Sequence, residues 1–246
     1  MTGAKVIMKE EFTRSAMLLG SEGIRRLADS HVALFGLGGV GSYAAEALVR
    51  AGVGRITAVD SDTVSASNIN RQLFALHSTV GMYKTEAFAL RARDINPDVQ
   101  LELCRAFVLP ENVGQFAWHS FDYVIDAVDT VAAKIAIACL CSREKIPLIS
   151  CMGTGNKLHP ELLEVQDISR TRMCPLARVM RRELKNRGID TLRVVYSPEE
   201  PIKPLPLCDA EGRRAVPGSV SFVPGAAGLM AAGEAIRFLA QHSRET

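Results

Sequence analysis

Three charged side chains in the first half of the sequence have the chemistry needed to bind a polyphosphate. Arg71 lies in the segment SASNINRQ, and Lys84 follows it near the start of a predicted helix. A guanidinium binds phosphate oxygens through two parallel hydrogen bonds, and an ammonium binds them as a compact point charge. Asp129, in the segment DAVDT, supplies a carboxylate that can share a magnesium ion with phosphates. Together these residues predict a site for a nucleoside triphosphate.

A glycine-rich turn, GLGGVG at 36–41, precedes these residues. Such a turn brings backbone amides and a helix N-terminus close to a phosphate, but it does not identify the nucleotide. Asp60 ends the next predicted strand, where its carboxylate can accept hydrogen bonds from ribose hydroxyls. Both features also suit NAD. A triphosphate carries about twice the charge of a pyrophosphate bridge, however, and NAD would leave Arg71, Lys84 and Asp129 without a task. The sequence therefore favours ATP over NAD.

Each charged residue also has a purely structural interpretation. Arg71 and Lys84 could be solvated surface charges, and Asp129 could cap the helix predicted to start at Thr130. The positions of all three at the carboxyl edge of one predicted parallel sheet favour ligand binding, because open α/β folds bind their ligands at that edge.

The segments around these residues predict alternating strands and helices. Short apolar runs at 31–35, 55–60, 99–104, 121–129 and 146–153 are typical of buried strands. Helical spacing at 40–52, 84–96 and 130–145 separates them, and a short helix is predicted at 110–118. This alternation predicts an α/β fold of the Rossmann-like doubly wound type, with a mainly parallel sheet.

The alternation changes after Gly153, and we expect later strands to extend the same sheet. Strands at 161–171 and 192–197 flank a predicted helix at 174–188, and a last strand at 220–224 precedes a helix at 225–241. Between them, a proline-rich stretch predicts a long mobile loop near 197–218.

The motifs resemble those of the ThiF/MoeB/HesA superfamily, the adenylating domains related to ubiquitin-activating enzymes. The matching segments are GLGGVG, VDSDTVSASNINRQ, VGMYKTEA and DAVDT. The resemblance implies a ThiF-type fold in which a carboxylate attacks the α-phosphate of ATP, giving an acyl-adenylate and pyrophosphate. It also implies one adenylating domain over residues 1–246, with a nucleotide-binding half at 1–153 and a substrate and dimer half at 154–246.

The resemblance further assigns roles to single residues. Asp60 would hold the ribose, Arg71 and Lys84 the phosphates, and Asp129 the magnesium ion. An arginine near the N-terminus of the family reaches the ATP of the partner subunit, and Arg14 in EFTRSAMLLG matches its place, which implies a homodimer. The implied catalytic residues are Arg14, Arg71, Lys84 and Asp129. The other implied ATP-binding residues are Gly36, Gly38, Gly39, Gly41, Asp62, Asn68, Asn70 and Gln72.

Longer segments resemble the tRNA threonylcarbamoyladenosine dehydratase branch of the superfamily. They include NINRQLFAL, MGTGNKLHP, CPLARVMRRELKNRG and RRAVPGSVSFVPGAAGLMAAGEAI, and the likeness runs from about Phe12 to Ala240. That branch adenylates the threonylcarbamoyl carboxylate on a tRNA adenosine, and ring closure then releases AMP. The implied partner is therefore tRNA carrying threonylcarbamoyladenosine.

Two alternatives stay open. One is a MoeB/ThiF-type adenylyltransferase acting on ubiquitin-like or sulfur-carrier proteins, although such members typically hold zinc on two Cys-x-x-Cys pairs, which this sequence lacks. The other is a non-catalytic nucleotide-binding partner of a sulfur-relay system, and sulfur-relay proteins remain candidate partners of this chain. Some members also carry the acyl group on a cysteine, but ring closure needs no thioester, so we interpret Cys174 as structural.

The predicted helix at 174–188 has a basic face. Its basic residues fall at i, i+3, i+4 and i+7, opposite Leu176, Met180 and Leu184. Most such faces are only solvated, but few acidic residues accompany this one, which favours contact with an RNA backbone. The candidate RNA-binding residues are Arg178, Arg181, Arg182 and Lys185.

The composition adds little about partners. The net charge is only +2, and no apolar run approaches the roughly 20 residues needed to span a bilayer. The N-terminal segment lacks the apolar region of a secretory signal. We therefore expect a cytoplasmic protein with no membrane partner.

Overall fold

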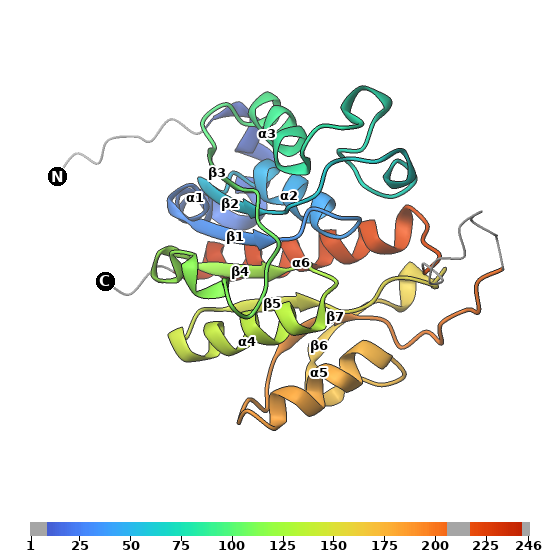
Figure 1. Cartoon of the computed structure of the whole chain (residues 1–246). Coiled ribbons are helices and arrows are strands. Elements are labelled where there is room, and N and C mark those ends of the chain that lie inside the picture. The colour runs from blue at the N-terminus through green and yellow to red at the C-terminus, as the bar shows by residue number, and fades with distance from the viewer. Residues whose placement is uncertain (1–8, 206–216, 243–246) are drawn as a thin grey trace.

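Seven short strands form one sheet in the computed structural model, which describes residues 9–205 and 217–242 (Figure 1). The order across the sheet is β3-β2-β1-β4-β5-β7-β6. All neighbouring strands are parallel except β6, which runs antiparallel to β7. This arrangement confirms the predicted doubly wound, mainly parallel sheet extended by later strands. The strands are β1 (His31–Phe35), β2 (Arg55–Val59), β3 (Gln100–Cys104), β4 (Tyr123–Asp126), β5 (Leu148–Cys151), β6 (Glu164–Asp167) and β7 (Arg193–Tyr196).

The strand order reverses between β1 and β4. β1 is buried along its whole length and pairs with β2 on one side and β4 on the other. The chain continues from β1 to its neighbour β2 on one side and from β4 to its neighbour β5 on the other, so the segments after β1 and β4 separate at the carboxyl ends of these strands. This switch point is where open α/β sheets form a ligand-binding crevice.

One face of the sheet is covered by α1 (Thr13–Asp29), α2 (Gly41–Arg50), α3 (Lys84–Ile95) and α6 (Phe222–Gln241). α1 was not among the elements predicted from the sequence, and it bends where Gly20 takes a φ of 75°. α6 packs against α1 and α2 through small residues, and a Cβ at Gly228 would lie 2.2 Å from the carbonyl oxygen of Val40. Small side chains on α6 therefore let α6 and α2 approach each other closely.

By length and composition alone, α6 is apolar enough to cross a membrane. Half of that stretch is buried inside the protein, and Val223, Ala227, Ala231 and Ala235 have no exposed surface. These contacts are those of a core helix.

The opposite face is covered by α4 (Val131–Glu144) and α5 (Pro175–Lys185), which contact each other. Under α4, the ring of Trp118 stacks on Phe35 of β1, with centroids 5.4 Å apart. Under α5, Met180 and Leu184 are fully buried against β7. Figure 1 shows the sheet between the two helix layers.

Two predicted elements are wrong. Residues 220–224 are not a strand, because α6 already begins at Phe222 and contains Pro224 in its first turn, where a helix tolerates proline. Residues 110–118 form turns and 3-10 segments instead of a continuous helix. The 3-10 segments of the described residues are η1 (Glu10–Phe12), η2 (Ala66–Asn68), η3 (His77–Thr79), η4 (Val113–Gln115), η5 (Trp118–Ser120), η6 (Pro160–Leu162) and η7 (Ile168–Arg170).

The proline-rich segment after β7 is only partly described, because 206–216 lie outside the described residues. Its first part is anchored. The buried ammonium of Lys157 donates hydrogen bonds to the carbonyls of Ser197 and Glu199, at 3.2 and 2.6 Å. Asn156 holds both ends of the segment, because its carbonyl accepts from Ile202 and its side chain accepts from the amide of Gly218. These contacts fix the base of the predicted loop next to the segment that follows β5.

Candidate active site

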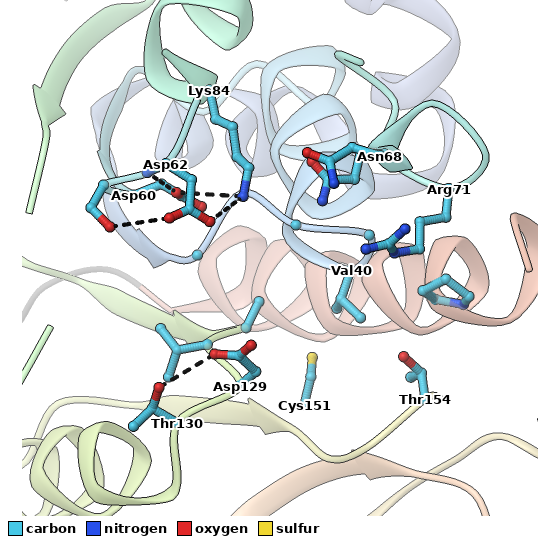
Figure 2. Close-up of a pocket in the computed structure, with 18 of the residues that line it drawn as sticks. Val40, Asp60, Asp62, Asn68, Arg71, Lys84, Asp129, Thr130, Cys151 and Thr154 are labelled. Atoms are coloured by element: carbon cyan, nitrogen blue, oxygen red, sulfur yellow. Dashed lines mark hydrogen bonds and ion pairs between the residues drawn. The ribbon is translucent and has the colours of Figure 1, made fainter. Parts of the chain in front are cut away.

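A cavity of about 950 Å³ lies at the carboxyl ends of the parallel strands, over the switch point. One wall is formed by the turn between β1 and α2, by the segment 60–72 and by Lys84. The opposite side is formed by 127–130 after β4 and by 151–155 after β5, and we call these two segments the floor of the cavity. Figure 2 shows charged side chains from the wall facing Asp129, Cys151 and Thr154 on the floor.

The glycine turn brings the chain into the cavity without blocking it. Gly36 has a φ of 92°, and a Cβ there would lie 2.7 Å from the carbonyl oxygen of Ala127. Gly36, Gly38 and Gly39 line the cavity. Gly41 does not line it, but a Cβ there would lie 1.8 Å from the carbonyl oxygen of Gly36, so this glycine permits the close packing of α2. No described side chain caps α2, although the amide of Ser42 already donates to the carbonyl of Gly38. The positive end of the helix dipole can still favour an anion here.

Asp60 follows β2, and its carboxylate is oriented by the backbone. One oxygen accepts a hydrogen bond of 2.7 Å from the amide of Leu37, and the other accepts one of 2.9 Å from the amide of Asp62. These bonds tie the segment after β2 to the glycine turn after β1. A carboxylate held in this way can accept from the hydroxyls of a ribose placed in the cavity.

Lys84, the first residue of α3, is buried at the same wall. Its side chain is 8% exposed, and its Nζ lies 2.6 Å from Oδ2 of Asp62 and 3.7 Å from Oδ1 of Asp60. The side chain of Asp62 is 63% exposed, so the pair lies at the rim of the cavity (Figure 2). The two carboxylates compensate the ammonium charge that the sequence analysis assigned to phosphate binding.

Arg71 reaches the cavity from the segment after η2. Its guanidinium donates hydrogen bonds of 2.9 Å to the carbonyl of Ser67 and to the side chain of Asn70. Asn70 in turn donates to the carbonyl of Ser219, just before α6. Asn70 is outside the cavity lining and holds the guanidinium in place, whereas Asn68 and Gln72 line the cavity.

Asp129 lies on the floor, across the cavity from the glycine turn. Its side chain is exposed, and among the described residues its recorded hydrogen bond comes from the hydroxyl of Thr130, at 3.3 Å. Thr130 is the N-cap residue of α4, and no described side chain caps that helix. Asp129 therefore does not act as the cap that its position before a helix allowed.

The described residues contain no group of three or more His, Cys, Asp or Glu side chains that could hold a metal ion. One carboxylate beside a phosphate site nevertheless suits Mg²⁺, which keeps most of its water and binds substrate phosphates. The donor set therefore fits a metal that arrives with a nucleotide, and it does not fit a site built from protein ligands alone.

Arg14 lies apart from this cavity. It is exposed on α1 and is absent from the cavity lining. Within one chain it therefore meets none of the groups that gather around the glycine turn.

The predicted basic face of α5 is divided. Arg181 is partly buried and donates to the carbonyls of Ile168 and Thr171 and to the Thr171 hydroxyl, so it fixes the chain before the helix. Arg182 is exposed and pairs with Glu183 at 3.1 Å. Arg178 and Lys185 are exposed, and no described residue is recorded as their partner. The exposed basic group is therefore Arg178, Arg182 and Lys185.

The structure adds residues that the sequence analysis did not assign. Val59, Ala106, Phe107 and Val108 give the end of the cavity near Asp60 an apolar lining. The floor segment MGTGN, with Thr154, was noted only as a point of resemblance, although its position directly after a predicted strand was the available signal. Cys151 also lines the cavity, and burial raises the pKa of its thiol to about 12, so the thiol remains protonated at neutral pH.

Comparisons with known proteins show similarity in sequence and fold. The model of the ThiF family matches residues 12–246. The tRNA threonylcarbamoyladenosine dehydratase of Bacillus subtilis (strain 168) is 43% identical over 239 residues, which cover 93% of this chain and 94% of that protein. The crystal structure of Escherichia coli tRNA N6-threonylcarbamoyladenosine dehydratase, TcdA, in complex with ATP has a TM-score of 0.85 at 36% identity, and the match covers 93% of each chain. The molybdopterin-synthase adenylyltransferase of Escherichia coli (strain K12) is 37% identical over 142 residues, 56% of each chain.

Proposed function

The chain belongs to the ThiF family, and we propose that it is an ATP-dependent dehydratase acting on tRNA that carries threonylcarbamoyladenosine. The observation that carries this proposal is a single cavity that gathers the glycine turn, Asp60, Arg71, Lys84 and Asp129, the residues predicted to bind ATP. It lies in a chain that resembles a dehydratase over 93% of its length. The likeness to a molybdopterin-synthase adenylyltransferase covers only 56% of the chain, which makes a carrier protein the weaker candidate substrate.

The cavity has three regions, which suit the nucleoside of ATP, its phosphates and the acceptor carboxylate. The apolar end, with Val59 and Phe107, suits the adenine, and Asp60 beside it suits the ribose. The wall with Arg71 and Lys84 suits the phosphates. The floor beyond Asp129, from Cys151 to Gly155, then remains for the acceptor carboxylate. We therefore place the adenine at the apolar end and the phosphates beside Arg71 and Lys84.

The chemistry needs positioned charge more than it needs a base. An oxygen of the threonylcarbamoyl carboxylate attacks the α-phosphorus, the bond to the β-phosphate breaks, and pyrophosphate leaves. Arg71 and Lys84 stabilise the charge that develops on the phosphates. An internal nitrogen or oxygen of the modified nucleoside then attacks the activated carbonyl carbon, the bond to AMP breaks, and one proton of the nucleoside passes to solvent. The product is a ring, and the nucleoside has lost one water.

Magnesium, when bound with ATP, would neutralise phosphate charge, and Asp129 is the residue that would hold it. The phosphates must then lie between the wall and the floor, because Asp129 belongs to the floor and Lys84 to the wall. This arrangement is part of the proposal.

We also propose a homodimer, because Arg14 meets no phosphate site in its own chain and the family uses an arginine at this place toward the partner subunit. The exposed group of Arg178, Arg182 and Lys185 is the proposed contact for the RNA backbone. We place the reaction in the cytoplasm on the basis of its substrates, ATP and tRNA.

The proposal is tested by measuring AMP release from ATP with three additions: tRNA carrying threonylcarbamoyladenosine, the same tRNA without that modification, and a carrier protein ending in Gly-Gly. The proposed dehydratase releases AMP only with the modified tRNA. AMP or pyrophosphate exchange that requires the carrier protein would instead establish an adenylyltransferase. ATP binding with no AMP in any arm would establish a nucleotide-binding module.

A further inference from the structure

A buried lysine beneath the cavity connects the two segments of its floor. Lys134, on α4, is 1% exposed, and its ammonium donates a hydrogen bond of 2.6 Å to the carbonyl oxygen of Cys151. The same ammonium lies 3.1 Å from the carboxylate of Asp126, which is fully buried at the end of β4. Lys134 therefore joins the ends of β4 and β5, the two strands from which the floor segments start.

The carboxylate of Asp126 extends this connection. Its Oδ1 accepts a hydrogen bond of 3.2 Å from the amide of Val128, one residue before Asp129. Its Oδ2 accepts one of 2.6 Å from the hydroxyl of Ser150 on β5. Each floor segment is thus fixed directly after its strand, at Val128 on one side and at Cys151 on the other.

Stability alone does not account for an ion pair at this place. Removing two charges from water costs free energy, and apolar side chains of similar volume often stabilise a core as well or better. What the pair supplies is direction, because the ammonium and the carboxylate each fix a backbone group at a set angle and distance. Both backbone groups belong to segments that line the cavity.

We propose that Lys134 and Asp126 are positioning residues, which hold the floor of the cavity so that an acceptor carboxylate faces the nucleotide bound along the opposite wall. The identity of that acceptor rests on the proposed function. Attack on the α-phosphorus requires reacting atoms about 3 to 3.5 Å apart and aligned, and a displacement of about 1 Å can cost roughly 100-fold in rate. Neither residue touches substrate in this arrangement.

The wall that binds the nucleotide does not depend on this connection. Asp60 is oriented by the amides of Leu37 and Asp62, and Lys84 is held by the Asp62 carboxylate. A loosened floor should therefore slow the chemical step and leave the affinity for ATP nearly unchanged when it is measured without magnesium, because Asp129 on the floor is proposed to act through that ion. This separation distinguishes positioning from a general loss of structure.

The test uses the full-length double variant Lys134→Met/Asp126→Asn. It removes both charges together, so no unpaired charge remains buried, and the asparagine can still accept from Val128 and pair with Ser150. What is lost are the hydrogen bonds that the Lys134 ammonium donates to the carbonyl of Cys151, to the hydroxyl of Ser150 and to the Asp126 carboxylate. Tyr196→Phe is the matched control, because it removes a buried hydroxyl that donates to Glu164 in the same sheet, away from the cavity lining.

Three readouts decide the proposal. In the double variant we expect AMP release with modified tRNA to fall by about tenfold or more, while the dissociation constant for ATP, measured without magnesium, changes by less than about threefold. We also expect faster amide hydrogen exchange in the peptide containing 151–155 and unchanged exchange in β1. Tyr196→Phe should leave all three readouts at their wild-type values.

Wild-type turnover together with wild-type exchange at 151–155 would overturn the proposal, as would a parallel loss of ATP affinity and of protection in β1, which would indicate a purely structural role. If the wild-type protein releases no AMP with modified tRNA, the proposed function fails. Hydrogen exchange and ATP affinity then still decide whether Lys134 and Asp126 hold the floor, because neither readout requires the reaction.

Discussion

The ammonium of Lys84 lies 2.6 Å from the carboxylate of Asp62, and both side chains line the wall of the cavity that carries Asp60. The lysine is almost buried, whereas the aspartate is mostly exposed. The ammonium is therefore already fixed at the wall when a phosphate arrives, and little side-chain entropy remains to be lost on binding. The aspartate competes with the phosphate for the same cation, which limits how tightly the nucleotide is held.

The two cations that we propose to bind phosphate give the first prediction. Arg71→Ala and Lys84→Gln should each lower AMP release by about 100-fold, because each removes charge stabilisation of the phosphates while the adenylyl group is transferred. Thermal unfolding should stay near that of the wild type for Arg71→Ala. Arg143→Ala, on the exposed surface of α4, is the control and should have no effect on turnover. Wild-type rates in both site variants would remove the phosphate assignment.

Asp129 gives a prediction about magnesium. Asp129→Asn should shift the magnesium dependence of AMP release to concentrations about tenfold higher, because an amide is a weaker ligand for this cation than a carboxylate. The measurement is a magnesium titration at fixed ATP and tRNA, with the exposed Glu111→Gln as the control. An unchanged titration curve would mean that Asp129 does not contact the metal.

The surface of α5 gives a prediction about RNA. Arg178→Glu/Arg182→Glu should weaken tRNA binding by about tenfold and flatten its salt dependence by about one unit of slope for each phosphate that is no longer neutralised. Charge reversal is directed at these two residues because Arg181 is engaged with the Thr171 carbonyl and hydroxyl. Arg143→Glu changes an equally exposed charge on α4 and should leave the slope unchanged. An unchanged slope in the double variant would identify this face as merely solvated.

The thiol of Cys151 gives a prediction about pH. Burial raises its pKa from 9.0 to about 12, so the folded protein keeps a proton that the unfolded chain releases from about pH 9 upward. Stability should therefore be independent of this group below pH 9 and should fall above it, by at most about 1.4 kcal/mol per pH unit. Cys151→Ala should lack this extra loss, as urea unfolding at pH 8, 9 and 10 would show. If the free energy of unfolding fell with pH equally in the wild type and in Cys151→Ala, a buried, protonated thiol on the floor of the cavity would be contradicted.

The sequence alone predicted the sheet, and it placed the candidate ATP-binding residues at the carboxyl edge of that sheet, because both predictions depend on local patterns. The apolar strands alternate with helical spacing, and the glycine turn and Asp60 follow strands directly, so their carboxyl edge could be inferred. α1 was not predicted, because its kink at Gly20 interrupts the helical pattern. The start of α6 was misplaced, because VSFVP has the composition of a strand and Pro224 conceals the first turn of a helix.

The floor of the cavity could not be predicted in the same way. Lys134 is the only charged residue of the apolar stretch from Val131 to Ser142. Only the packing of α4 against β4 and β5 brings its ammonium to Asp126 and Cys151. Arg181 likewise shares a sequence face with Arg178 and Lys185, but a tertiary contact with Thr171 removes it from the exposed group. In both cases the position of the charged group depends on tertiary contacts that a local sequence pattern does not reveal.

The most direct test of the central claim is nucleoside mass analysis of tRNA carrying threonylcarbamoyladenosine, after incubation with the wild-type protein, ATP and magnesium. We predict that the modified nucleoside becomes lighter by one water, in proportion to the AMP released, and that Arg71→Ala leaves it unchanged. ATP consumption with the nucleoside mass unaltered would contradict the dehydratase proposal.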